Sequence, residues 1–149
     1  MTQILPGFLA LLCGILLTSQ IGSNALLGKL LGNSYVPAAI NMLIGAATTG
    51  LLLVVVHKPL PSGATAGTVP WYVWLAGGVL GTMYLTGTIL LAPKLGAGAL
   101  VALVVTGQLL FAVLCDHFGW LGFAQHSASL WRGAGCLLLV AGAALIAKF

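Results

Sequence analysis

The chain has 149 residues, of which 60% are hydrophobic and only 4% are charged, and its formal net charge is +4. Soluble domains carry about 25% charged residues. This chain has too few polar residues to cover the surface of a water-soluble domain, so it must lie in lipid. Its five basic residues are scattered singly. They form no stripe that could follow a phosphate backbone, which excludes a nucleic-acid partner.

Five apolar runs are long enough to cross the lipid bilayer as helices, since one span needs about 20 mostly apolar residues. In chain order they are residues 4–27, 36–56, 71–91, 95–115 and 130–147. The runs are too long and too evenly apolar for the strands of a closed barrel. The sequence therefore predicts an all-α membrane protein, a five-transmembrane-helix bundle that forms a single transmembrane domain over residues 1–149.

The segments between the runs carry turn-forming residues. GNSYVP (32–37) places Pro37 in the first turn of the second helix, and HKPLPSGATAGTVP (57–70) is predicted as a long loop. APKLGAG (92–98) is predicted as a tight turn, which would make the third and fourth helices antiparallel neighbours. DHFGWLGFAQHSAS (116–129) is amphipathic and aromatic, as expected of a short interfacial segment.

Basic residues fall almost evenly on the two predicted sides of the membrane: Lys58 and Arg132 on one, and Lys29, Lys94 and Lys148 on the other. The rule that positive charge stays inside therefore gives no clear orientation. Either the chain inserts both ways, or a partner or co-translational effects orient it.

Small residues recur at helix-packing spacing on the last three predicted helices. Gly77 and Gly81 form a GxxxG pattern, Gly98 begins a similar stripe, and Gly135 and Gly142 lie seven residues apart. Such stripes let helix backbones approach closely in lipid. They are predicted to serve helix packing or dimer contact.

Amide side chains are expensive in lipid unless they are paired, so they should face the bundle interior or a watered cavity. They can act as glue between helices, but their spread over several helices favours a shared polar cavity. The predicted lining is Gln20, Asn24, Asn41, Tyr84 and Gln108, with Trp71 and Trp74 at the mouth. Interfacial anchoring explains the two tryptophans about as well.

Asp116 is the only acidic residue and ends an apolar run, where the helix dipole disfavours it. Three roles are open. It could cap a segment that begins at His117, form an ion pair with Arg132 or Lys58, or act with His117 as a proton site. No catalytic constellation, metal-ligand set or cofactor motif occurs in the sequence, so an enzyme is not expected.

Several stretches together resemble the DUF606, or YdcZ-like, branch of the drug/metabolite transporter superfamily, along most of the chain. They are SQIGSNALLGKLLG (19–32), PWYVWLAGGVLGTMYL (70–85), LLAPKLGAGALVALVVTGQL (90–109) and DHFGW (116–120). The resemblance implies a multi-pass protein of the bacterial inner membrane that exports small metabolites or drugs. It also implies that two inverted units work together, formed by two copies of the chain or by the chain and a paralogue.

The chain is also similar in size and glycine placement to the small multidrug resistance proteins. Those carry a membrane-embedded Glu in the first helix, where this chain has Gln20 and Asn24. This departure counts against proton-coupled export of cations.

The resulting expectation is an antiparallel homodimer of dual topology, in which alternating access moves a neutral, zwitterionic or weakly polar organic substrate. Two other classes remain open. One is a membrane scaffold or accessory subunit that transports nothing, and the other is a passive pore.

Overall fold

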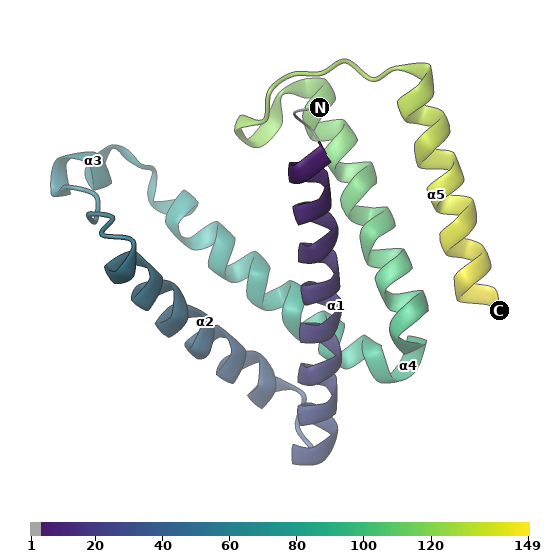
Figure 1. Ribbon diagram of the computed structural model, residues 1–149, viewed down its shortest axis with the longest axis horizontal. Helices are drawn as coiled ribbons and strands as arrows, with labels where there is room; N and C mark the ends of the chain where they lie inside the picture. The colour runs from purple at the N-terminus through teal and green to yellow at the C-terminus, as the bar shows by residue number, and fades with distance from the viewer. Residues whose placement is uncertain (1–3) are drawn as a thin grey trace. The chain divides into compact units, whose positions relative to one another are not determined.

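The fold, seen in a computed structural model that describes residues 4–149, is helical throughout (Figure 1). Its elements are α1 (Ile4–Leu31), α2 (Tyr35–Val55), α3 (Gly63–Thr68), α4 (Trp71–Phe118), the 3-10 turn η1 (Trp120–Gly122) and α5 (Leu130–Lys148). No strand occurs within residues 4–149, which confirms the predicted all-helical class. The chain divides into two compact units, one ending at Pro93 and the other beginning at Lys94.

The first helix is longer than expected, because its end is set by the backbone and not by hydropathy. It continues past residue 27 to Leu31. Gly32 then adopts φ 64°, the left-handed conformation that commonly ends helices. The N–H of Asn33 donates to the carbonyl of Gly28 at 3.1 Å, which closes the last turn.

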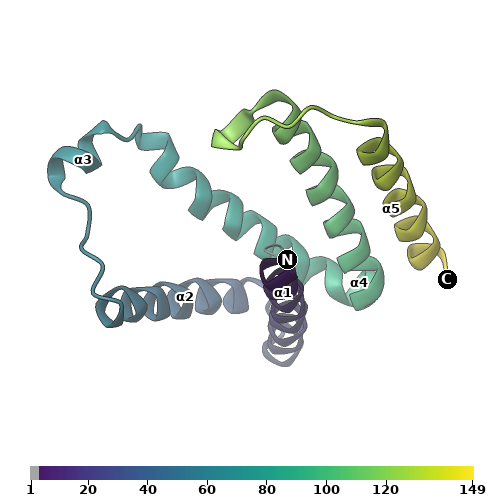
Figure 2. The same cartoon turned by 45° about the horizontal axis from the view of Figure 1, so that its top comes forward.

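The start of α2 follows at once. The side-chain oxygen of Asn33 accepts hydrogen bonds from the N–H groups of Tyr35 at 2.9 Å and Val36 at 3.3 Å. These are two of the N–H groups that the first turn of a helix leaves free. Pro37 lies in this first turn, as predicted, where its missing N–H costs nothing. Figure 2 shows α2 leaving the end of α1 through this short connection.

A break in the helical backbone lies within residues 92–98, the segment that the sequence predicts as a turn. Helix α4 runs from Trp71 to Phe118, through Pro93, and only Gly96 departs from helical dihedral angles. Its φ of 76° and ψ of 161° lie in a region that is essentially restricted to glycine. Helix α4 is therefore two helical stretches that meet at Gly96.

Both longer connections contain structure that the sequence did not predict. The 57–70 segment includes α3, and the Ser62 hydroxyl accepts a hydrogen bond from the Thr65 N–H at its start. In the 116–129 segment the first residues continue α4 to Phe118. The turn η1 follows, with left-handed φ angles at Gly119 and Leu121.

The core of the first unit lies where α1, α2 and the first stretch of α4 meet. Ala38, Leu85 and Ile89 are buried together, with Met42 packed against them. Gly28 of α1 lies at this contact, where an added Cβ atom would be 3.4 Å from Cγ2 of Ile89, at the short end of ordinary van der Waals contact.

In the second unit, the second stretch of α4 packs against α5. A Cβ atom at Gly98 would lie 3.7 Å from Cγ2 of Ile146, which is ordinary van der Waals contact. Leu100 and Cys115 of α4 and Ala143 of α5 are buried. Helix α5 begins after Ser129, whose hydroxyl accepts a hydrogen bond from the N–H of Arg132 at 3.3 Å.

Four helices of residues 4–149 are long and apolar enough to cross a membrane: α1, α2, α4 and α5. Many of their large apolar side chains are exposed, Leu43 and Val54 among them at more than 70%. A water-soluble monomer rarely exposes apolar surface on this scale, whereas lipid accommodates it. The fold is that of a multi-pass membrane protein.

Candidate functional site

A cluster of three amides joins α1 to α2. Gln20 and Asn24 lie one turn apart on α1, and both point their NH2 groups at one atom of α2. The side-chain oxygen of Asn41 accepts from Gln20 Nε2 at 3.0 Å and from Asn24 Nδ2 at 3.2 Å. Asn24 is buried, Asn41 is half-buried and Gln20 is exposed.

The amide cluster lies one helical turn away from the core contact of the first unit. Gly28 meets Pro37 and Ile89 at the end where α1 passes into α2. One turn back along α1 from Gly28 is Asn24, and one turn onward along α2 from Pro37 is Asn41. The close packing at Gly28 therefore sets the separation of the two amide-bearing helix faces.

The hydrogen bonds within the cluster leave a defined set of polar atoms unused. Both lone pairs of the Asn41 oxygen are occupied, but the Asn41 NH2 group donates to nothing among the described residues. The side-chain oxygens of Gln20 and Asn24 likewise accept no hydrogen bond there. The cluster therefore offers donors and acceptors to a further molecule without offering any charge.

Tyr84 carries a second unused polar group in the same unit. It precedes Leu85, which belongs to the buried core that holds Ala38 of α2. Its hydroxyl oxygen is buried and has no hydrogen-bond partner within residues 4–149. Because a buried hydroxyl without a partner is costly, this group is available to a water molecule or a ligand.

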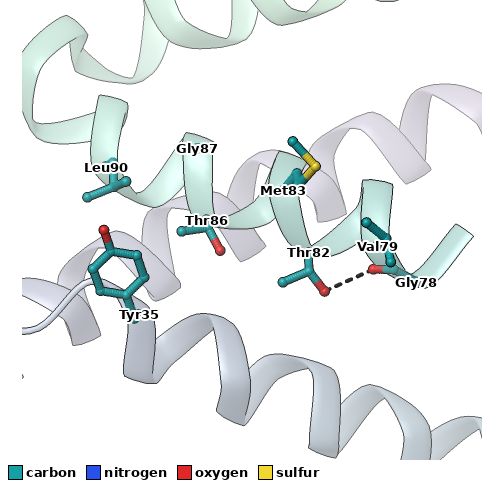
Figure 3. Close-up of a pocket in the computed structure, with 8 residues that line it drawn as sticks. All are labelled: Tyr35, Gly78, Val79, Thr82, Met83, Thr86, Gly87 and Leu90. Atoms are coloured by element: carbon teal, nitrogen blue, oxygen red, sulfur yellow. Dashed lines mark hydrogen bonds between the residues drawn. The ribbon is translucent and has the colours of Figure 1, made fainter. Parts of the chain in front are cut away.

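A groove of about 630 Å³ opens between the start of α2 and one face of α4 (Figure 3). The groove is largely apolar. Figure 3 draws one hydrogen bond in it, in which the Thr82 hydroxyl donates to the Gly78 carbonyl at 2.9 Å, and both residues belong to α4. Its lining is Tyr35, Gly78, Val79, Thr82, Met83, Thr86, Gly87 and Leu90. The small residues at 78, 82 and 86 recur every four positions and therefore lie along one face of α4.

Asp116 forms an ion pair with Arg132 in the second unit. Arg132 Nη1 lies 3.1 Å from Asp116 Oδ2, and their side chains are 38% and 29% exposed, respectively. The same Nη1 donates to the carbonyl of His126 at 3.5 Å. Asp116 lies inside α4, so it does not cap a segment beginning at His117, which was one of the three roles that the sequence left open.

The chain between Asp116 and Arg132 is held by a further set of hydrogen bonds. The N–H of His126 donates to the Asp116 carbonyl at 2.7 Å. His117 Nδ1 accepts from the N–H of Ala128 at 3.1 Å, and its carbonyl accepts from Gln125 Nε2 at 3.0 Å. His117 thus braces this segment through its backbone and ring.

Three further predicted site residues, Gln108, Trp71 and Trp74, have exposed side chains. Gln108 lies in the second unit, where its side chain is exposed and makes no hydrogen bond to a described residue. Trp71 and Trp74 are exposed at the start of α4, and the Trp71 ring packs edge-on against Tyr72. Their exposure is compatible with both interpretations, the interfacial anchor and the mouth of a pathway.

Of the five glycines predicted for helix packing, only Gly98 has a close neighbour within the chain. An added Cβ atom would meet no atom of the described residues within 4 Å at Gly77, Gly81, Gly135 or Gly142. These four positions leave helix surface open to lipid or to another chain. Within residues 4–149, no three His, Cys, Asp or Glu side chains gather as a metal site would need.

These features define a class, a multi-pass membrane protein with an uncharged polar cluster between apolar helices. A family model described as "Putative inner membrane exporter, YdcZ" matches residues 5–145, nearly the whole chain. The chain belongs to this YdcZ family of inner membrane proteins, as the resemblance predicted. Neither the curated proteins nor the solved structures contain a significant match.

Proposed function

We propose that the protein is a transporter that exports small organic molecules across the bacterial inner membrane. The amide cluster is the observation behind this proposal. The Asn41 oxygen accepts two hydrogen bonds, while the Asn41 NH2 group and the side-chain oxygens of Gln20 and Asn24 have no partner among the described residues. Polar side chains within membrane spans are costly, so an incompletely paired cluster of them is a candidate for a substrate pathway. The family's description as an exporter supports the same conclusion.

We infer five membrane spans: α1, α2, α5 and two within α4. Helix α4 has 48 residues. At 1.5 Å per residue this is about 70 Å, more than twice the hydrocarbon thickness of about 30 Å. We therefore assign each stretch, before and after Gly96, to a separate span.

With an odd number of spans, the two termini lie on opposite sides of the membrane. The near-even distribution of basic residues then favours insertion in both orientations. Two inverted copies, or the chain and an inverted paralogue, would enclose one pathway. Alternating access follows from such symmetry, because the two halves exchange roles between the inward-open and outward-open states.

The proposed substrate is neutral or zwitterionic, because the cluster provides amide donors and acceptors but no charge. The Asn41 NH2 group can donate to a carbonyl oxygen of the substrate. The oxygens of Gln20 and Asn24 can accept from its N–H or O–H groups. A cation would find no carboxylate in the first unit, whose sequence to Pro93 contains no acidic residue.

Gln20→Leu is expected to abolish saturable transport while the protein remains folded, because it removes both the donor to Asn41 and a free acceptor. The measurement is counterflow in liposomes of a panel of neutral amides, nucleosides and amino acids. Thr18→Val is the matched control on α1, since the Thr18 hydroxyl bonds only to the Gly14 carbonyl of its own helix. Gln108→Leu in the same assay reports whether the second unit contributes.

Flux that never saturates would identify a passive pore instead. Absence of flux for every solute, together with normal folding of all variants, would favour the non-transporting scaffold, in which the amides only join helices.

Roughly equal populations of the two orientations are expected in the membrane. A reporter fused after Phe149 and a single cysteine introduced in the 57–70 segment would be assayed from both sides. A single orientation would rule out the dual-topology homodimer and direct the search to a paralogue of opposite orientation.

A further inference from the structure

The second unit contains a groove that the proposed pathway does not use. It lies between the second stretch of α4 and α5 and has a volume of about 610 Å³. This is within the range of about 300–1,000 Å³ that is typical of ligand pockets. Leu109, Ala112 and Leu139 contribute apolar lining, and Asp116 and Arg132 contribute the only charges.

Both members of the ion pair keep polar atoms free toward a further molecule. Arg132 uses Nη1 for Asp116 and for the His126 carbonyl, whereas its Nε and Nη2 groups donate to no described residue. Asp116 uses Oδ2, and its Oδ1 accepts no side-chain hydrogen bond within residues 4–149. A guanidinium with free N–H groups suits a phosphate, and a free carboxylate oxygen suits an ammonium group.

The two charges cancel, which decides the charge of the best ligand. A phosphate that approaches Arg132 also meets the negative charge of Asp116, whose oxygen is only 3.1 Å from the guanidinium. An anionic lipid would leave this repulsion uncompensated. A ligand that carries a phosphate and a neighbouring ammonium group satisfies both residues, and the apolar remainder of the groove fits an acyl chain.

We propose that this groove binds one zwitterionic phospholipid of the phosphatidylethanolamine class. Its phosphate lies at Arg132, its ammonium group donates to Asp116, and one acyl chain lies along the groove over Ala112. The site is independent of the proposed transport function.

The test is native mass spectrometry of the full-length protein, titrated in detergent with phosphatidylethanolamine, phosphatidylcholine or phosphatidylglycerol. We expect phosphatidylethanolamine to be retained roughly two- to fivefold better than phosphatidylglycerol, the difference that a partly exposed ion pair provides. Phosphatidylcholine should bind more weakly than phosphatidylethanolamine, since its quaternary ammonium cannot donate a hydrogen bond.

Asp116→Asn should remove the preference for phosphatidylethanolamine over phosphatidylglycerol while retaining lipid binding. Ala112→Phe leaves the ion pair intact but fills the groove, and should reduce the retention of all three lipids. Leu137→Phe is the control, because Leu137 is exposed on α5 outside the groove.

Two results would overturn the proposal. One is unchanged lipid retention in Ala112→Phe. If this variant changes the oligomeric mass while lipid retention stays the same, a second copy of the chain fills the groove, and the proposal is equally overturned. The other is the same lipid preference in the unaltered protein and Asp116→Asn. If Asp116→Asn does not fold, the Ala112→Phe comparison decides alone.

Discussion

Replacing Gly96 by alanine is expected to lower the stability of the protein by about 1–3 kcal/mol, the cost of holding a non-glycine residue in a sparsely populated backbone region. Gly96 has φ 76° and ψ 161°, and it is the only non-helical residue within α4. The measurement is thermal unfolding in detergent. Its readout is the loss of the monodisperse peak in size-exclusion chromatography after heating.

The alternative available to the Gly96→Ala variant is equally unfavourable. If the strained residue relaxes to helical angles, α4 becomes one continuous helix of 48 residues with at most a kink at Pro93. Such a helix is about 70 Å long, so roughly half of it would leave the bilayer core of about 30 Å. We therefore expect less correctly inserted protein as well as lower thermal stability.

Gly107→Ala is the matched control for this experiment. Gly107 lies in the same helix with no atom within 4 Å of an added Cβ and without a positive φ. Alanine is the better helix former by about 1 kcal/mol, so this variant should be as stable as the unaltered protein or more stable. Equal stability of Gly96→Ala and Gly107→Ala would show that the break at Gly96 is dispensable.

Asn41→Leu is expected to have the larger effect on function, because one atom of Asn41 holds two other amides. Removal of its side-chain oxygen leaves Gln20 and Asn24 without their acceptor. The expected loss of stability is about 1–2 kcal/mol, since buried donors without partners are costly but hydrogen bonds in membranes are individually weak. Saturable transport should be lost completely.

The experiment compares Asn41→Leu, Gln20→Leu and the double variant for stability and for flux in liposomes. Because Gln20 donates to Asn41, the destabilisation by the two changes should be less than additive. Thr48→Val is the control on α2, since the Thr48 hydroxyl bonds only to the Ile44 carbonyl of its own helix. Full transport by Asn41→Leu would remove the amide cluster from the pathway and leave it a role in joining helices.

The segment around Asp116 illustrates how local sequence signals can mislead. Its position at the end of an apolar run suggested a helix boundary, where a cap, an ion pair and a proton site were all open. The helix instead continues to Phe118, and Asp116 reaches an arginine 16 residues further along the chain. The backbone hydrogen bonds of a helix do not require apolar side chains, so the end of the apolar run and the end of the helix need not coincide.

The groove beside this ion pair had no comparable signal in the sequence. Leu109 and Leu139 belong to runs that are apolar on every side, so hydropathy alone cannot indicate which faces meet. The same limit applies to the Tyr84 hydroxyl, which could be predicted to lie in a span but not to lack a partner. Partners depend on the rotation and separation of neighbouring helices.

The sequence by itself determined that the protein is helical and belongs in a membrane, and it identified the family. These properties depend on sums over local residues, since about 20 apolar residues must pair their own backbone groups in lipid. Only the tertiary structure decided that Asn41 is the shared acceptor of the amide cluster and that Asp116 pairs with Arg132. Those contacts arise from close approaches such as Gly28 against Ile89, which set the distance between helices and have no counterpart in composition or hydropathy.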